Sequence, residues 1–237
     1  MKPKRLLALE TSTPVARVGV FDIDGGACLA EASATSERHS SNLLRLCVDV
    51  TARAGVALSD LAAIACGAGP GSFTGLRVGF AVAKGFALPF GIPLLTVSSL
   101  QVLARDMAAA DGYAEGVAAC YLPCLDAGKG QIYAAAFAPS GAGLERRGED
   151  WVVVPVAISD VAPAEGTLVF AGTGAVRYRA ALQEALGARA RFAEVAGPSA
   201  TSVAAYATER FRQGAFEDLN SAVPAYGRAP DITRPKR

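Results

Sequence analysis

The stretch that decides the fold is Cys66-Gly-Ala-Gly-Pro-Gly-Ser-Phe-Thr-Gly-Leu-Arg-Val-Gly-Phe-Ala-Val-Ala-Lys-Gly-Phe-Ala-Leu88. Its first half is dense in glycine, which tolerates positive φ angles and lets another group approach the backbone closely. Its second half has the pattern of a helix that is apolar on most of its circumference. A short apolar run at 62–66 precedes it. The sequence therefore predicts a buried strand, a tight turn and a buried helix, with a phosphate group, another helix or both close to the turn.

The glycine-rich turn does not match the known phosphate-binding and nucleophile motifs. None of its glycines is followed by Lys-Ser or Lys-Thr, as a Walker loop requires, and Ser72 stands where the dinucleotide-binding pattern needs a glycine. The Gly-x-Ser-x-Gly motif of serine hydrolases also fails, because Pro70 and Thr74 flank Ser72 at the two glycine positions. On pattern alone, an ordinary strand-to-helix turn capped by Ser72 or Thr74 is favoured.

The composition excludes several classes of protein. The chain has 237 residues, of which 51% are hydrophobic and 19% charged, and its net charge of +1 lacks the basic excess of proteins that bind tRNA by their own electrostatics. No apolar run reaches the ~20 residues that span a bilayer, and the N-terminus resembles no signal or transit peptide. We therefore expect a cytoplasmic protein without membrane contact. Five cysteines without a Cys-x-x-Cys pair and a single histidine, His39, predict neither disulfides nor a metal site.

Hydrophobic periodicity predicts an α/β protein. Three short strands joined by tight turns come first, and strands and helices then alternate up to residue 110. A second group of strands after Asp111 suggests a smaller copy of the same unit. The predicted strands are 5–11, 15–21, 27–34, 62–66, 93–97, 117–125, 131–138, 150–154 and 168–171, and the predicted helices are 40–54, 75–88, 99–110, 175–186 and 201–213.

Ordered motifs along the chain resemble the TsaB (YeaZ-like) family, the non-catalytic paralogues of TsaD in bacterial synthesis of tRNA threonylcarbamoyladenosine. Two departures from the family pattern stand out: Glu10 where relatives often carry Asp, and Gly128-Lys129 where an arginine usually follows Asp-Ala. The motifs are Leu6-Leu-Ala-Leu-Glu10-Thr-Ser-Thr13, Glu37-Arg-His39-Ser-Ser-Asn-Leu-Leu44, Gly69-Pro-Gly-Ser-Phe-Thr-Gly-Leu-Arg77, Val97-Ser-Ser-Leu100, Leu125-Asp-Ala-Gly-Lys-Gly-Gln-Ile-Tyr133 and Pro224-Ala-Tyr226-Gly-Arg228.

The resemblance implies a two-lobed fold of the actin, sugar-kinase and Hsp70 class (ribonuclease H-like), with mixed sheets flanked by helices. The domains expected from it are 1–110, an N-terminal lobe that carries the partner helices, and 111–219, a smaller C-terminal lobe whose last helix could return to the first lobe. An extended basic tail at 220–237 follows. Its cations are candidate contacts for tRNA or a partner: Arg228, Arg234, Lys236 and Arg237.

The function that the resemblance implies is that of a scaffold or activator subunit. It would bind TsaD for threonylcarbamoyl transfer to the adenosine next to the tRNA anticodon, with the ATPase TsaE joining a larger assembly and tRNA bound only within the complex. It would perform no chemistry, need no cofactor and form a homodimer when alone. The alternative is an actin-like ATPase or small-molecule kinase with its own nucleotide site.

A degenerate nucleotide site is expected at two places. In ATP-binding relatives the first hairpin turn holds the phosphates, and Glu10, Thr11, Ser12 and Thr13 occupy that position here. Gly172 and Gly174 would contact the adenosine. An ordinary hydrogen-bonded turn is the competing interpretation at both places. A third candidate, Asp126 with Lys129 and Tyr133 on a hairpin, is interpreted as surface polarity.

The strongest functional signal in the sequence is an apolar helix surface. Arg77 and Lys84 mark a narrow polar stripe on the helix from Gly75, and the helix at 40–54 has an apolar arc of roughly 200°. Because one sheet should not bury all of this, a partner protein is expected to cover the rest, with coverage by the second lobe as the alternative. The predicted interface residues are Leu43, Leu44, Cys47, Val48, Leu76, Val78, Gly79, Phe80, Val82 and Phe86.

Overall fold

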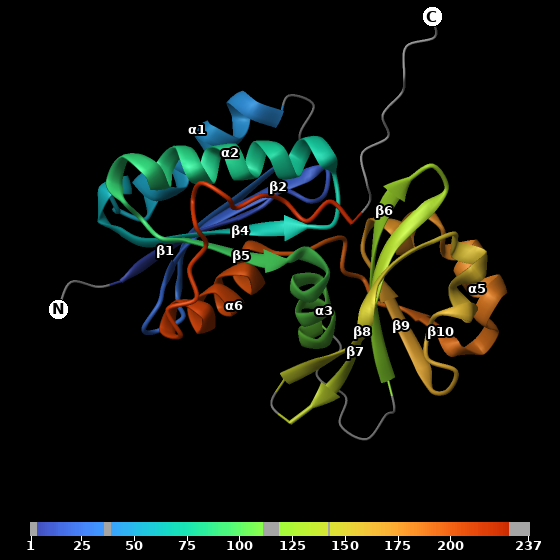
Figure 1. Cartoon of the computed structure of the whole chain (residues 1–237). Coiled ribbons are helices and arrows are strands. Elements are labelled where there is room, and N and C mark those ends of the chain that lie inside the picture. The colour runs from blue at the N-terminus through green and yellow to red at the C-terminus, as the bar shows by residue number, and fades with distance from the viewer. Residues whose placement is uncertain (1–3, 36–38, 111–118, 142, 228–237) are drawn as a thin grey trace, which may run out of the picture.

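Two five-stranded mixed sheets, each at the centre of one lobe, organise the computed structural model (Figure 1). It describes residues 4–35, 39–110, 119–141 and 143–227, and for 39–41 the backbone only. The first sheet has the order β3-β2-β1-β4-β5 and the second β10-β9-β6-β7-β8. In both, the first three strands of the unit form an antiparallel meander, and the last two are added in parallel to its first strand. The second copy of the unit that the sequence suggested is therefore confirmed.

The first sheet is buried on both faces. Its strands are β1 (Arg5–Glu10), β2 (Val15–Asp22), β3 (Cys28–Thr35), β4 (Leu61–Gly69) and β5 (Leu94–Ser98). In β1, Leu7 and Leu9 face the helices α1 (His39–Arg53) and α2 (Phe73–Phe90), whereas Leu6 and Ala8 face the opposite layer. This alternation follows from the two-residue period of a strand. The short 3-10 helix η1 (Leu58–Asp60) leads from α1 into β4.

The helix α3 (Ser99–Ala110) lies between the two lobes (Figure 1). Its residue Val102 packs against the first sheet, whereas Leu103 and Met107 pack against the second. All three side chains are fully buried. The helix therefore belongs to the cores of both lobes, which explains why its sequence is apolar on two sides.

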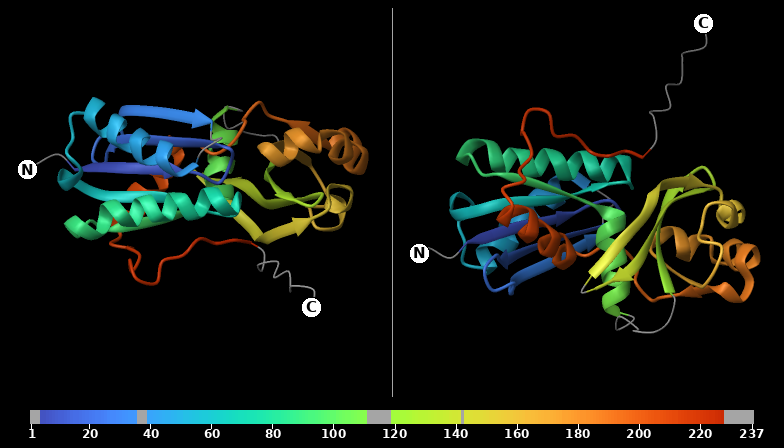
Figure 2. Two further views of the ribbon diagram at one scale, coloured as in Figure 1. Left: turned by 90° about the horizontal axis from the view of Figure 1, so that it is seen from above. Right: turned by 60° about the horizontal axis from the view of Figure 1, so that its bottom comes forward.

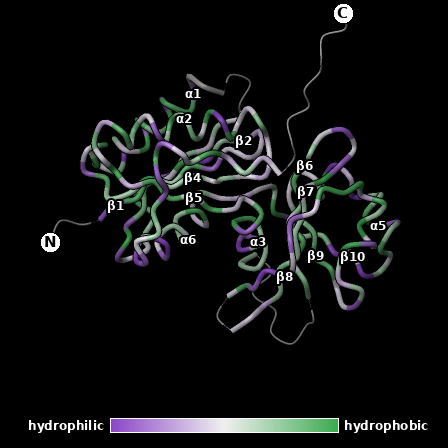
Figure 3. Tube along the Cα trace, in the orientation of Figure 1, coloured by the Kyte–Doolittle hydropathy of each residue, from purple (hydrophilic) through white to green (hydrophobic). Residues whose placement is uncertain are grey.

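The second sheet is covered by α3 on one face and by short helices on the other. Its strands are β6 (Ala119–Gly128), β7 (Gln131–Ser140), β8 (Gly143–Val153), β9 (Thr167–Ala171) and β10 (Ala190–Phe192). The covering helices are α4 (Thr173–Arg177), α5 (Arg179–Leu186) and the 3-10 helix η2 (Pro155–Asp160), with η3 (Gly187–Arg189) before β10. Figure 3 shows hydrophobic residues through the central strands of both lobes and hydrophilic residues mainly at the periphery.

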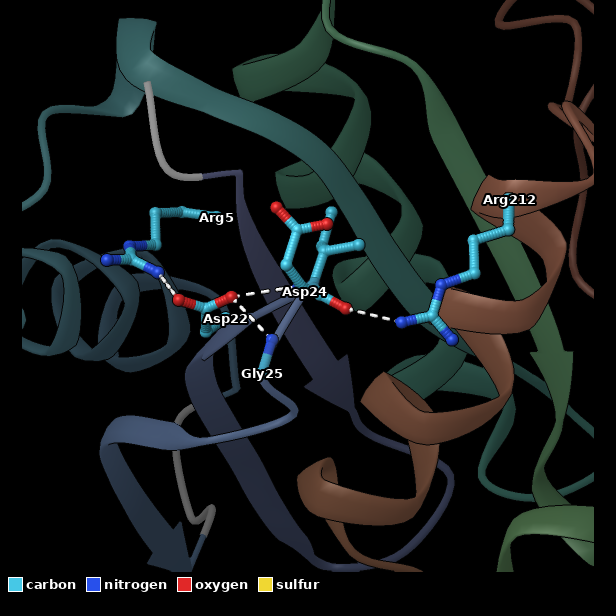
Figure 4. Close-up of polar contacts among 6 residues, drawn as sticks. Arg5, Asp22, Asp24, Gly25 and Arg212 are labelled. Carbon is cyan, nitrogen blue, oxygen red and sulfur yellow. Dashed lines mark hydrogen bonds and ion pairs between the residues drawn. The ribbon is translucent and has the colours of Figure 1, made fainter. Parts of the chain in front are cut away.

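The last helix, α6 (Ala200–Arg212), contacts β1, β2, β4 and β5 of the first sheet although it follows the second lobe in the chain (Figure 2). At its end, Arg212 donates a hydrogen bond of 3.0 Å to the carbonyl oxygen of Ile23 in the β2–β3 turn (Figure 4). That turn is stabilised by Asp22, which pairs with Arg5 and accepts hydrogen bonds from the backbone of Asp24 and Gly25.

The boundaries between the predicted domains stay predictions.

The N-terminal end of α6 is held by α3. Asp106 accepts hydrogen bonds from the backbone N–H and hydroxyl of Ser199, each 2.7 Å, and from the hydroxyl of Ser202 at 2.5 Å. Burial raises the pKa of the Asp106 carboxyl, and these hydrogen bonds oppose that effect. A carboxylate at a helix N-terminus satisfies donors that have no partner within the helix.

The chain after α6 crosses back over the first lobe (Figures 1 and 2). Glu217 forms an isolated antiparallel bridge with Leu94, so this segment covers the edge of β5. Further on, the backbone N–H of Ala225 donates to the carbonyl oxygen of Ala68 at 2.8 Å. Residues 220–227 form no helix or strand, whereas 228–237 lie outside the described residues.

Two predicted elements differ from the structure, and one strand was not predicted. The helix expected at 175–186 is divided into α4 and α5 at Tyr178, whose backbone leaves the helical region with φ −114° and ψ 24°. Strand β8 begins at Gly143 rather than at 150. The prediction missed its first half because those residues are exposed and charged and do not alternate between polar and apolar side chains. Strand β10 was missed because three residues carry no periodic pattern. Among the described residues, no helix has the length and hydropathy needed to cross a membrane.

Candidate functional site

The loop after β1, where the sequence predicted degenerate phosphate contacts, is closed to solvent. Glu10, Thr11, Ser12 and Thr13 have exposed fractions of 0%, 6%, 3% and 4%. Beside the loop lies a cavity of about 10 Å³ lined in part by Thr11, Thr13 and residues of α1 and α2. That is about the space that one water molecule needs, so this cavity is too small for a phosphate group.

The glycines of the 66–88 stretch explain why the loop is closed. A Cβ atom on Gly67 would lie 2.1 Å from Oε2 of Glu10, and one on Gly75 would lie 2.1 Å from the carbonyl oxygen of Thr11. At Gly79 it would lie 2.3 Å from Oγ1 of Thr11. Only glycine permits such contacts. The group that approaches the glycine-rich segment is thus the chain's own loop, whereas the sequence had predicted a phosphate or a second helix.

The carboxylate of Glu10 fastens this loop to two other elements. Its Oε1 accepts a hydrogen bond of 2.7 Å from the backbone N–H of Ser12, and its Oε2 accepts one of 3.0 Å from the hydroxyl of Ser99. The Ser99 oxygen in turn accepts from the backbone N–H of Gly69 at 3.2 Å. Burial raises the pKa of Glu10, and the hydrogen bonds from Ser12 and Ser99 partly offset the rise. The carboxylate joins the ends of β1 and β4 to the start of α3.

Gly172 and Gly174, the predicted adenosine contacts, are positions of close packing in the second lobe. Gly172 has φ +94°, and a Cβ atom there would lie 2.5 Å from the carbonyl oxygen of Cys124. Gly174 lies in α4, and a Cβ atom there would be 3.0 Å from the backbone of Leu125. The expected turn is therefore the start of a helix pressed against β6.

The structure relates the two candidate places through the segment between β10 and α6. The backbone N–H of Gly172 donates to the carbonyl oxygen of Val195 at 2.9 Å. Two residues later, a Cβ atom on Gly197 would lie 3.2 Å from Cγ2 of Thr13. The segment 195–197 thus lies between the loop after β1 and the start of α4.

Asp126, the third candidate, anchors α4. Its Oδ2 pairs with Nη1 of Arg177 at 2.9 Å, and its Oδ1 accepts from the backbone N–H of Gly128 at 3.0 Å. The hydroxyl of Tyr178 lies 3.4 Å from the same oxygen. The carboxylate that the sequence left without an arginine on its own hairpin therefore pairs with one from α4. Sequence reasoning missed Arg177 because nothing local relates it to the hairpin.

The predicted partner surface on α1 and α2 is narrower than expected. Six of the predicted residues are buried within this chain: Leu43, Cys47, Leu76, Gly79, Phe80 and Phe86. Leu44 and Val48 are 49% and 46% exposed, and Val78 and Val82 are half-buried. The helices α1 and α2 pack on each other as well as on the first sheet. They therefore bury more apolar side chains than the sheet alone could cover. Further apolar side chains are exposed on α2 at Phe73, Leu88 and Phe90.

Within the described ranges, no three His, Cys, Asp or Glu side chains are grouped so that they could hold a metal ion. The helix α1 begins at His39.

Comparison with known proteins gives a consistent result. The family model described as TsaD, tRNA N6-adenosine threonylcarbamoyltransferase, matches residues 32–234. The tRNA threonylcarbamoyladenosine biosynthesis protein TsaB of Escherichia coli K12 is 29% identical over 224 residues, which are 94% of each chain. A Pseudomonas aeruginosa crystal structure, described as an uncharacterized protein with similarity to peptidase YEAZ, has a TM-score of 0.79 and 28% identity, and covers 95% of this chain and 100% of its own.

A more distant structure shares the fold alone. Component A of the (R)-2-hydroxyglutaryl-CoA dehydratase of Acidaminococcus fermentans has a TM-score of 0.50 and 12% identity, over 90% of this chain and 99% of its own.

Proposed function

This chain belongs to the TsaD family, and within it to the TsaB (YeaZ-like) group, and from this membership we propose that it is a non-catalytic subunit in tRNA threonylcarbamoyladenosine biosynthesis. It binds the TsaD paralogue in the cytoplasm and activates threonylcarbamoyl transfer to the adenosine next to the tRNA anticodon. The ATPase TsaE joins the larger assembly, and the isolated chain forms a homodimer through the same helices.

The observation that carries this proposal is the closed loop after β1. An ATP-binding member of the fold class must admit phosphate oxygens to this loop, and here the loop is buried and packs closely against Gly67 of β4 and against Gly75 and Gly79 of α2. To act as an ATPase or a kinase, the chain would have to release Glu10 from Ser12 and Ser99. Each buried hydrogen-bonding group left without a partner costs about 1–3 kcal/mol. The geometry supports a subunit that positions another protein over one that transfers phosphate.

The apolar side chains that remain exposed on α1 support a partner-binding role. Leu44 and Val48 are one turn apart, so they lie on the same side of the helix. The half-buried Val78 and Val82 repeat this spacing on α2. We call these exposed and half-buried apolar side chains on α1 and α2 the ridge. A helix pair with such a ridge suits packing against helices of another protein.

Four measurements on the purified chain test the proposal. Isothermal titration calorimetry with Mg²⁺-ATP and an ATP hydrolysis assay are expected to show neither tight binding nor turnover, and a peptide-cleavage assay no activity. Sedimentation velocity with the purified TsaD paralogue is expected to show a complex. ATP turnover that disappears in a folded Glu10→Gln variant would overturn the subunit role in favour of an ATPase.

A further inference from the structure

The segment 214–227 is packed along the first lobe although it forms no helix or strand (Figures 1 and 2). Its half-buried and exposed residues alternate over 215–219 and again over 222–227, as in an extended chain with one side against the protein. Leu219 and Ala222 pack against the core of the first lobe. Because an irregular segment loses conformational entropy when it is ordered, contacts of this kind must offset the loss.

The last three residues that the structure describes are fixed to the first lobe, and we refer to Ala225, Tyr226 and Gly227 as the clasp. The backbone N–H of Ala225 donates to the carbonyl oxygen of Ala68 in β4 at 2.8 Å. The hydroxyl of Tyr226 accepts a hydrogen bond of 3.2 Å from Nε of Arg77, and its ring centroid lies 4.9 Å from that of Phe73. The clasp is therefore attached where β4 ends and α2 begins.

Gly227 lies between the two lobes. A Cβ atom on Gly227 would lie 2.8 Å from Cε1 of Tyr133, which belongs to β7 of the second lobe. It would also lie 3.0 Å from Cβ of Pro70, in the turn between β4 and α2. The φ angle of Gly227 is +65°, which also favours glycine. The end of the clasp thus contacts both lobes and leaves no room for a side chain.

The clasp and α3 join the lobes at different places. Helix α3 contributes Val102 to a core of the first lobe and Leu103 to a core of the second. In the view of Figure 1, α3 lies below the ends of β4 and β5, whereas the segment 214–227 ends above α3, nearer to α2. A rotation of one lobe about α3 would separate Pro70 from Tyr133. The clasp opposes such a rotation because it contacts both residues.

The turn that the clasp contacts also covers the buried loop after β1. Pro70 is followed by Gly71, and a Cβ atom on Gly71 would lie 2.6 Å from Cβ of Ser12. The backbone N–H of Ser72 donates to the carbonyl oxygen of Ser12 at 2.7 Å. A movement of Pro70 away from the second lobe would therefore loosen the packing that keeps the loop from solvent.

We propose that the clasp restrains the rotation of the two lobes about α3 and so keeps the loop after β1 buried. When the clasp is released, the lobes rotate, the packing of Pro70 and Gly71 on Ser12 is lost, and the loop becomes accessible to solvent. The inference goes beyond the proposed subunit role and does not depend on it, because every contact that carries it lies within this chain.

Hydrogen exchange of backbone amides measures the accessibility of the loop. Gly227→Ala introduces a Cβ atom for which there is no room, at a φ angle that alanine disfavours, and so releases the clasp. The amides of Ser12 and Ser72, both hydrogen-bonded within the loop region, are expected to exchange about 5- to 30-fold faster than in the wild type. The amides of Leu7 and Ala8 in the central strand β1 report global unfolding and should be unaffected.

The distance between the lobes is measured independently by pulsed electron–electron double resonance. One spin label is attached to Cys28, the exposed cysteine of β3, and the other to a Glu184→Cys substitution on α5 of the second lobe. With the clasp intact, one narrow distance distribution is expected. Gly227→Ala in the same labelled protein should broaden the distribution or add a second distance.

Variants in the same segment serve as matched controls. Gly214 has nearly the same φ angle, +66°, but a Cβ atom there would meet nothing within 4 Å, so Gly214→Ala should change neither measurement. Tyr226→Ala removes the ring that lies on α2 and should act like Gly227→Ala. Phe216→Ala removes an exposed ring that lies 5.7 Å from Phe211 of α6, and should have no such effect.

Three results would overturn the proposal. If Gly227→Ala accelerates exchange only at Ala225, the clasp is a local contact. If the distance distribution stays narrow, the arrangement of the lobes does not depend on the clasp. If the amides of β1 accelerate as much as those of the loop, or if Gly214→Ala acts like Gly227→Ala, the effect reflects global stability or backbone strain.

Discussion

A Cβ atom on Gly79 of α2 would lie 2.3 Å from Oγ1 of Thr11, so the helix approaches the loop after β1 at a distance that only glycine permits. Alanine is normally preferred to glycine inside a helix by about 1 kcal/mol. At this position we expect the reverse. Gly79→Ala should lower the free energy of unfolding by about 1–3 kcal/mol, because the loop must be displaced to admit the methyl group. Urea denaturation measures the change.

The same helix provides the control, because a Cβ atom on Gly85 would meet nothing within 4 Å. Gly85→Ala should therefore stabilise the protein by about 0.5–1 kcal/mol. Thr11→Ala removes the oxygen that Gly79→Ala would strike, so the double variant should lose less than the sum of the single variants. Additive losses, or equal effects at Gly79 and Gly85, would show that the contact does not limit the helix.

The buried carboxylate of Glu10 makes stability depend on pH. Burial raises the pKa of Glu10 above the usual 4.5, so the Glu10 carboxyl binds its proton more tightly in the folded protein than in the unfolded chain. Stability therefore falls as the pH rises from about 4.5 to the folded-state pKa, and stays lower above it. Glu10→Gln should remove this component, so that the stability of the wild type relative to the variant decreases with rising pH.

Urea denaturation of both proteins across this pH range, with the difference taken at each pH, tests the prediction. Taking the difference removes the contribution of Asp22, whose lowered pKa acts with the opposite sign. The same substitution at the exposed Glu184 corrects for the general loss of one carboxylate. A difference that stays constant or grows with pH would mean that the Glu10 carboxyl is not destabilised by burial.

Much of the fold could be predicted from local pattern. The helix α3 has the predicted bounds because Ser99 opens it and its apolar period is regular. The boundary of α4 and α5 lies at Tyr178, whose backbone leaves the helical region. It could not be predicted, because a tyrosine is not a helix-breaking residue. Likewise, the β8 edge lacks the alternation on which strand prediction relies.

The turn after β1 was predicted in position, but its closure was not. The motif placed Glu10–Thr13 in a hairpin turn, and the structure has a turn there. Its closure depends on Gly67 of β4 and Gly79 of α2, which are remote in sequence and whose role becomes visible only when both elements pack against the loop. A helical wheel also could not separate Val78, which is half-buried, from Phe80, which is 4% exposed.

Thiol reactivity should report the burial of the cysteines. Cys28 is exposed, whereas Cys47, Cys66, Cys120 and Cys124 are buried. Burial raises the pKa of the Cys47 thiol to about 12 and raises the pKa of Cys66 and Cys124 still further, so hardly any reactive thiolate is present near pH 8. An aromatic disulfide reagent should therefore modify one thiol in the native protein and all five after denaturation.

The substitution Cys28→Ser serves as the control and should abolish the reaction of the native protein. A second thiol that reacts quickly without denaturant would mean that the packing around one of the buried cysteines opens readily in the native protein.

The exposed ridge on α1 should carry the partner contact. Leu44→Asp and Val48→Asp place a carboxylate on side chains that are 49% and 46% exposed in the single chain, so each variant should stay folded, within about 0.5 kcal/mol of the wild type. If this ridge becomes buried in the homodimer and the TsaD complex, an unpaired carboxylate there should weaken both about 100-fold or more. Sedimentation velocity with and without the TsaD paralogue measures both equilibria.

Two comparisons make this result specific. Val176→Asp introduces the same charge at a valine that is 73% exposed on α4, and should affect neither equilibrium. Phe80→Asp is unsuitable as an interface variant, because its side chain lies in the core between α2 and the first sheet and a carboxylate there should unfold the chain. If the Leu44→Asp and Val48→Asp variants are folded, bind the paralogue normally and each still form the homodimer, the partner surface does not include α1. The proposed heterodimer would then need a different face of the molecule.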